Sequence, residues 1–183
     1  MRLLVLGLLV LPACREDPEP PDPGEATSAA PATQPALADG RMLEAAFPGP
    51  THSRTNPVQT PYGTLEQHTQ MFQDEHGAFG VQWTEFPSER VARSSREAIY
   101  EQSVRGAAAA TGAQVREQRR VDLGGVEGRE VLVDDGRDHA YRARFFLVGN
   151  RLHHATVATT PARMAEPRVQ SFFDSLRLVP RKP

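Results

Sequence analysis

The six histidines are the residues of this chain best suited to bind a metal, but their spacing matches no metal-binding motif. They are His52, His68, His76, His139, His153 and His154. A zinc site needs three or four converging ligands, and the chain has neither an HExxH sequence nor a pair of cysteines. Adjacent residues of a strand point to opposite faces, so His153 and His154 cannot share one ion. We therefore expect no metal and no cofactor, and interpret the histidines as packed or solvated.

The acidic and glycine-rich segments also lack the partners that catalysis requires. The segment 134–138 has three aspartates and a glycine, as in a calcium loop, but no glutamate closes it, so an acidic turn is the better interpretation. The glycines of 124–128 lack the lysine and the following helix of a phosphate-binding loop. There is no Gly-x-Ser-x-Gly sequence, and the chain contains a single cysteine, Cys14. We identify no catalytic residue.

Arginines on neighbouring predicted strands could together bind an anion. The candidates are Arg116, Arg120, Arg142 and Arg144, with Arg119 nearby. The alternative is a set of solvated strand faces on which acidic residues balance the arginines. These acids would be Glu117, Asp122 and Glu130. Balanced faces of this kind are the commoner arrangement.

The overall charge excludes a typical nucleic-acid-binding protein. The chain has 183 residues, of which 39% are hydrophobic and 24% charged, and a formal net charge of −2. From residue 40 onward, 19 basic residues stand against 17 acidic ones. Because no concentrated basic face is indicated, we expect no nucleic-acid partner.

The first 14 residues have the layout of a secretion signal. Arg2 precedes an apolar run from Leu3 to Leu11, which is too short to span a bilayer as a helix, and the segment ends in Leu11-Pro12-Ala13-Cys14. It resembles a bacterial lipoprotein signal peptide, residues 1–13, with its lipobox. The resemblance implies cleavage before Cys14 and fatty acyl chains, such as palmitate, on this residue as the membrane anchor. Arg15 at the next position resembles the sorting pattern for the outer membrane, facing the periplasm. The alternative is an ordinary signal peptide with an incidental cysteine.

Residues 14–39 are predicted to form a tether. They contain six prolines, six acids and few large apolar residues, so they cannot bury enough surface to offset the entropy of ordering. We interpret them as a disordered spacer, with a proline-rich docking ligand as the alternative. Residues 40–183 then form one globular domain.

The domain is organised around a predicted β-hairpin. His139 to Val148 and Arg151 to Thr159 read as strands joined by Gly149-Asn150, which suits a type II′ turn. A two-residue loop places Phe145 opposite His154 and Phe146 opposite His153. Both faces carry apolar residues, so each should be covered by a helix or a second sheet.

The remaining pattern predicts strands on both sides of a long helix. Strands are expected at 42–47, 58–62, 64–73, 78–86, 114–123 and 130–134, with 51–56 as a polar loop. The helix should start at Ser88 and end at Gly112, with a weak point at Gly106. A second helix follows Pro167, because Val169, Phe172, Phe173 and Leu176 recur at helical spacing, and a last short strand or turn is expected at 176–179. The fold class is therefore α+β, with an antiparallel sheet of about seven strands covered by a long central helix and a C-terminal helix.

Several segments of the domain resemble the PsbP-like α/β/α sandwich group found in many bacterial lipoproteins. They are Phe47-Pro48-Gly49, Phe79-x-Val81-x-Trp83, 141–152 and 171–178. These are folding signals, and no catalytic residue can be carried over from them. The resemblance implies an accessory or binding role. We expect a non-catalytic envelope lipoprotein that binds another envelope protein or a small ligand, with a hydrolase or metal-dependent enzyme without a recognisable motif as the alternative.

Overall fold

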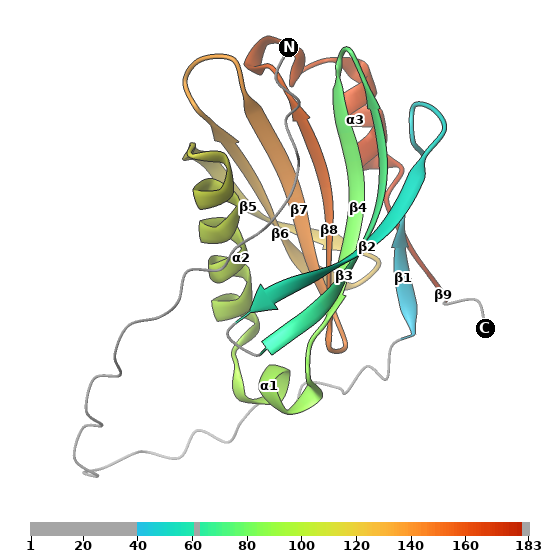
Figure 1. Cartoon of the computed structure of the whole chain (residues 1–183), viewed down its shortest axis with the longest axis vertical. Coiled ribbons are helices and arrows are strands. Elements are labelled where there is room, and N and C mark those ends of the chain that lie inside the picture. Colours follow the sequence, from blue (N-terminus) through green and yellow to red (C-terminus); the bar gives the residue numbers. More distant parts are fainter. Residues whose placement is uncertain (1–39, 61–62, 181–183) are drawn as a thin grey trace.

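The computed structural model describes residues 40–60 and 63–180. Its main sheet is antiparallel, with seven strands in the order β2-β3-β4-β8-β7-β6-β5 (Figure 1). A small sheet pairs β1 with β9. Cys14 and the predicted signal and tether lie outside the described residues. The strands are β1 (Arg41–Glu44), β2 (His52–Thr60), β3 (Gly63–Asp74), β4 (Gly77–Glu85), β5 (Gln114–Leu123), β6 (Val126–Asp134), β7 (Ala140–Val148), β8 (Arg151–Thr159) and β9 (Arg177–Pro180).

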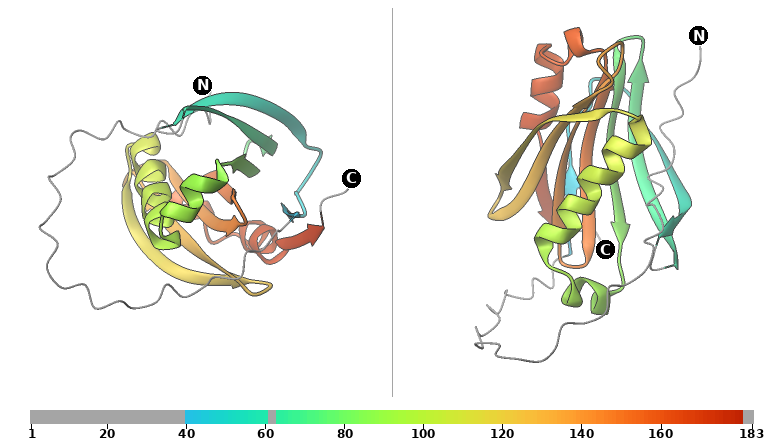
Figure 2. Two further views of the ribbon diagram at one scale, coloured as in Figure 1. Left: turned by 90° about the horizontal axis from the view of Figure 1, so that it is seen from below. Right: turned by 90° about the vertical axis from the view of Figure 1, so that its left-hand side faces the viewer.

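The helices lie on opposite faces of this sheet. They are α1 (Ser88–Arg93), α2 (Arg96–Thr111) and α3 (Pro167–Asp174), with a short 3-10 turn at Pro161–Arg163. The sheet is strongly curved, and α2 lies inside the curve (Figure 2). One core cluster lies under α2 and another under α3. An antiparallel sheet covered by helices is thus confirmed.

The predicted hairpin forms with the expected register. Phe145 pairs with His154 and Phe146 with His153, and Gly149 adopts φ 61°, the positive value that the first position of a primed turn requires. Nearly every side chain of β7 is buried, on both faces. The prediction that both faces are covered is therefore confirmed.

The prediction of one long helix is wrong, because the segment forms two helices, α1 and α2. Ser94 has an extended conformation (φ −107°, ψ 140°), and Ser95 caps the second helix by accepting a hydrogen bond from the Ala98 N–H at 3.1 Å. Serine favours helix caps because its hydroxyl competes for nearby backbone groups. The helix ends at Gly112 as predicted, but it runs through Gly106 without a break.

Two strands also extend beyond their predicted bounds. β2 includes the segment expected as a polar loop; Pro57 is tolerated because β2 is an edge strand with one neighbour. β6 begins at Val126, so Gly128 lies inside a strand. A Cβ atom there would lie 2.5 Å from the Phe146 ring, so close packing requires glycine.

Helix α3 is short, and its bulky face is fully buried as the sequence predicted. Phe172 and Phe173 are each 1% exposed and pack on the apolar residues of β7 and β8. The Phe172 ring meets the Phe79 ring edge to face, with centroids 5.4 Å apart.

Phe172→Ala should destabilise the protein by about 3–5 kcal/mol, because it removes a ring from a closed core. Thermal or urea unfolding would measure the change. The matched control is Ser171→Ala, since Ser171 is exposed on the same helix and should change the free energy of unfolding by less than about 0.5 kcal/mol. Equal stability of the two variants would contradict the packing of α3. Arg168 is a poorer control, because it pairs with Asp74 at 2.8 Å.

Candidate functional site

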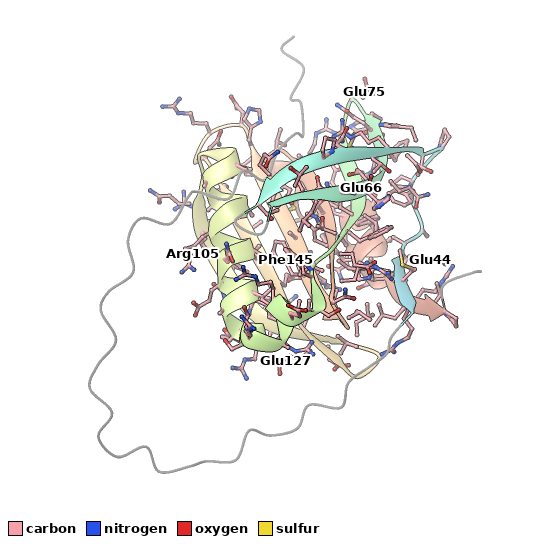
Figure 3. The ribbon with its side chains drawn as sticks, turned by 60° about the horizontal axis from the view of Figure 1, so that its bottom comes forward. Glu44, Glu66, Glu75, Arg105, Glu127 and Phe145 are labelled. Atoms are coloured by element: carbon pink, nitrogen blue, oxygen red, sulfur yellow. The ribbon has the colours of Figure 1, made fainter. Side chains whose placement is uncertain are left out.

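The candidate site is a cleft on the α2 face of the sheet. Helix α2 covers β5, β6 and β7, while β2 and β3 curl over the other side. The cleft is lined by residues of α2 and β3 and, between them, by residues of β4 and β8. Its larger part has a volume of about 430 Å³, and a smaller hollow of about 70 Å³ lies toward α1. Gln67 and His154 line both parts, so the two hollows meet at these residues. Figure 3 shows Phe145, which lines the smaller hollow, between α2 and the strands opposite.

Tyr100 fixes α2 at the edge of this cleft. Its hydroxyl donates to the Glu127 carbonyl at 2.7 Å and accepts the Leu147 N–H at 2.9 Å, which ties the helix to β6 and β7. Tyr100 is 1% exposed, and Val104 and Ala107 continue the same buried stripe. The spacing of these three residues is helical and marks this stripe in the sequence. Ala98 and Ala109 of the same helix are exposed.

The floor of the cleft is polar but uncharged. Gln82 and Thr84 of β4 are each 7% exposed, and His154 of β8 is 6% exposed. Gln82 and His154 are register partners. Tyr141 of β7 extends this row into the larger hollow. Burial raises the pKa of the Tyr141 hydroxyl, and the Thr156 side chain beside it acts in the opposite direction. These residues come from strands far apart in the sequence, so no local motif marks them.

The two adjacent histidines lie on opposite faces, as expected. Burial lowers the pKa of His154 to about 4, so its ring is neutral at pH 7, and its Nδ1 has no hydrogen-bond partner among the described residues. Burial, and then the charge of Arg151, lowers the pKa of His153 to about 3. His153 lies on the α3 face, where the backbone of Arg41 opposes the shift.

Most titratable side chains of the cleft lie at one end of it, away from its middle. They come from the β3–β4 turn, the β6–β7 loop and the connection after β8; the residues are Asp74, Glu75, His76, Asp138, His139 and Arg163. Ala158 at this end is four residues along β8 from His154, or about 13 Å. Within residues 40–60 and 63–180, no three His, Cys, Asp or Glu side chains are grouped so that they could hold a metal ion.

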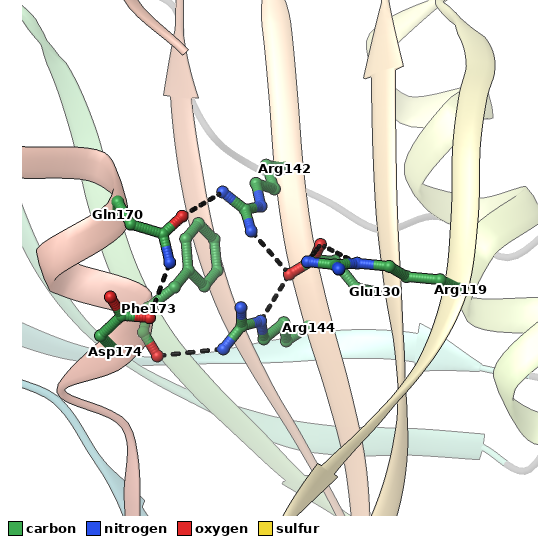
Figure 4. Close-up of polar contacts among 7 residues, drawn as sticks. All are labelled: Arg119, Glu130, Arg142, Arg144, Gln170, Phe173 and Asp174. Atoms are coloured by element: carbon green, nitrogen blue, oxygen red, sulfur yellow. Dashed lines mark hydrogen bonds and ion pairs between the residues drawn. The ribbon is translucent and has the colours of Figure 1, made fainter. Parts of the chain in front are cut away.

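The arginines predicted as an anion site do not form one strip. Arg142 and Arg144 lie together on the α3 face, where Arg142 Nη2 and Arg144 Nε donate to Glu130 Oε2 at 3.0 and 2.5 Å (Figure 4). Arg119 Nε donates to Glu130 Oε1 at 2.8 Å. Arg116 pairs with Asp134, next to a bulge in β5. Arg120 lies on the opposite face, near Glu127 at 3.7 Å.

The group formed by Glu130 with Arg119, Arg142 and Arg144, here called the Glu130 cluster, fastens α3 to the sheet. Arg144 Nη1 donates to the Phe173 carbonyl at 3.0 Å, and the guanidinium groups of Arg142 and Arg144 lie 4.6 and 5.0 Å from the centre of the Phe173 ring. Burial by itself would raise the pKa of Glu130, but hydrogen bonds from Arg144, Arg119 and Arg142 outweigh it and lower the pKa. The carboxylate therefore remains charged.

Glu130→Gln should destabilise the protein by about 3–5 kcal/mol, because it leaves two largely buried guanidinium groups without a carboxylate. Chemical denaturation would measure the loss. Glu127→Gln on the same strand is the matched control, since its pair with Arg120 is exposed and should contribute less than about 1 kcal/mol. A loss of similar size in both variants would contradict a structural role for the Glu130 cluster.

No membrane-crossing helix is present among the described residues, since none combines the required length with the required apolar character. No family model and no curated protein matches the chain. Among solved structures, the solution structure of cyanobacterial PsbP (CyanoP) from Synechocystis sp. PCC 6803 is similar, with 11% identity over 84% of this chain and 99% of that chain and a TM-score of 0.46.

Proposed function

We propose that this protein is an envelope lipoprotein, anchored through lipid on Cys14, whose folded domain binds a ligand in the cleft between α2 and β3 without catalysing a reaction. The observation that carries the proposal is the cleft itself. Its larger part, about 430 Å³, is within the usual range of small-molecule sites, and it combines apolar surface from alanines and Val133 with polar side chains on its floor and at one end.

The cleft favours binding over catalysis because of where its titratable groups lie. An enzyme site brings an acid, a base or a nucleophile to one point, whereas here the floor carries His154 among uncharged side chains, and the charged groups lie toward the two ends, with Arg90 at the α1 end. The described surface also has no large apolar patch for a protein partner, since Val115 is its one exposed large hydrophobic residue. A small ligand therefore fits the domain better than a protein partner.

The anchor part of the proposal rests on the sequence of residues 1–14 and places the protein at the outer membrane, facing the periplasm. Replacing Cys14 by Ser should release the protein from the membrane fraction, because two or three acyl chains on this residue would supply the attachment. Cell fractionation and immunoblotting would measure the distribution. A mutant that stays as membrane-bound as the wild type would refute the anchor.

A bulky side chain introduced on α2 tests whether the cleft binds a ligand. Ala110 is exposed and lines the larger hollow, so Ala110→Trp should fill its mouth without disturbing the core. The probe is Nile red, an uncharged apolar dye, added to the full chain carrying Cys14→Ser so that no detergent is needed. Ala110→Trp should weaken the binding of the dye at least about tenfold, or ~1.4 kcal/mol.

Ala109→Trp is the control for this experiment. Ala109 is the preceding residue of the same helix, is exposed, and does not line the cleft, so the same substitution there should leave the affinity unchanged. Equal weakening by both variants, or by neither, would show that the dye binds elsewhere and would remove the support for this cleft.

A further inference from the structure

We infer that the cleft selects an uncharged, amphipathic ligand that places hydroxyl or amide groups on the floor and an apolar part against α2. This inference rests on the proposed function and adds the chemical class of the ligand. Three features of the cleft carry it: the chemistry of the floor, the apolar walls, and the position of the charged groups.

The floor offers neutral hydrogen-bonding groups of both kinds. Gln67 and Gln82 carry amides and Thr84 a hydroxyl, and each of these groups both donates and accepts hydrogen bonds. His154, whose ring is neutral, lines both hollows beside them. A ligand group placed over this row can therefore exchange hydrogen bonds with two amides and a hydroxyl.

The accessible surface of the smaller hollow is mostly apolar. Val91 and Ile99 come from the helices, while Phe145 and Leu152 come from β7 and β8. The polar side chains on the helix side are Arg90, Ser94, Gln102 and Ser103, and the Ser103 hydroxyl already donates to the Ile99 carbonyl at 2.8 Å. A ligand that fills the hollow should therefore place its apolar part against Ile99 and its neighbours, because burying an unmatched polar group there would cost free energy.

A charged ligand group would find no opposite charge in the middle of the cleft. Arg90 lines the smaller hollow on the α1 side, and the other charged residues stand at the far end of the larger one. An ion placed over Gln82 and His154 would lose its hydration without a counter-charge, which strongly disfavours it. A hydroxyl or amide group placed there exchanges its hydrogen bonds to water for hydrogen bonds to the neutral amide and hydroxyl groups of the floor.

Three probes, each with a straight eight-carbon chain, test the inference. Octanoyl-N-methylglucamide has an uncharged head with an amide and hydroxyls, octanoate is an anion, and octylammonium is a cation. Each is titrated, below its micelle concentration, into the ¹⁵N-labelled full chain carrying Cys14→Ser, and amide shifts are followed by NMR. We expect the uncharged probe to shift the amides of Gln82, Thr84 and His154 and to bind at least about tenfold more tightly than either ion.

The outcomes separate this inference from the proposed function. If octanoate or octylammonium shifts the same amides with equal affinity, the selection for uncharged ligands is wrong while the cleft remains a binding site. If none of the three probes shifts cleft residues, both the inference and the proposed function are overturned.

Two substitutions on the floor sharpen the test. Thr84→Val preserves shape and removes the hydroxyl, and Gln82→Leu removes the amide; each should weaken the uncharged probe severalfold and leave the weak binding of the ions unchanged. Gln118→Leu is the control, because Gln118 is exposed on β5 outside the cleft. If both floor variants fold with wild-type spectra and bind the uncharged probe as the wild type does, the floor does not select the ligand.

Discussion

The structure depends on the β7–β8 hairpin, which must be covered on both faces. Phe145 and Phe146 are adjacent and point to opposite faces of the sheet, and each is 1% exposed. Ala143 on the Phe145 face and Val157 on the Phe146 face are both 0% exposed. A two-stranded ribbon with apolar residues on both sides is stable only between two further layers. The neighbouring strands widen the hairpin into a sheet, and α2 and α3 supply the layers.

The two covers differ, and this difference produces the cleft. Helix α3 places bulky rings on the sheet and is fastened by the Glu130 cluster, so its face is closed. Helix α2 presents small residues such as Ala107 and lies over one side of the curved sheet, held there by Tyr100. Helix α2 does not cover β4 and β8 on this face; β2 and β3 curl over them instead. The side chains buried there are polar.

Much of the fold could be predicted because its signals are local. Gly149-Asn150 fixed the register of the hairpin, and the helical spacing around Phe172 identified α3. The division of the long helix at Ser94 was not predicted, because a serine pair is compatible with both a helix and a cap. The cleft could not be predicted, because Gln67, Gln82 and His154 meet only through strand pairing. The arginines were recognised as a group, but the sequence could not show that Glu130 would be the shared partner of Arg119, Arg142 and Arg144. It also could not show that Arg116 and Arg120 would pair elsewhere.

The distribution of charge follows the same division between the two faces. Three guanidinium groups and one carboxylate are joined on the α3 face, where each charge has a partner and helps to hold a helix. On the α2 face the middle of the cleft carries no charge, and His154 stays neutral with an unmet ring nitrogen. Folding alone would favour an apolar side chain at this position, since a buried polar group without a partner reduces stability. His153 on the closed α3 face departs from this rule in the same way, so what sets the α2 face apart is the row of neutral amide and hydroxyl groups that line its cleft.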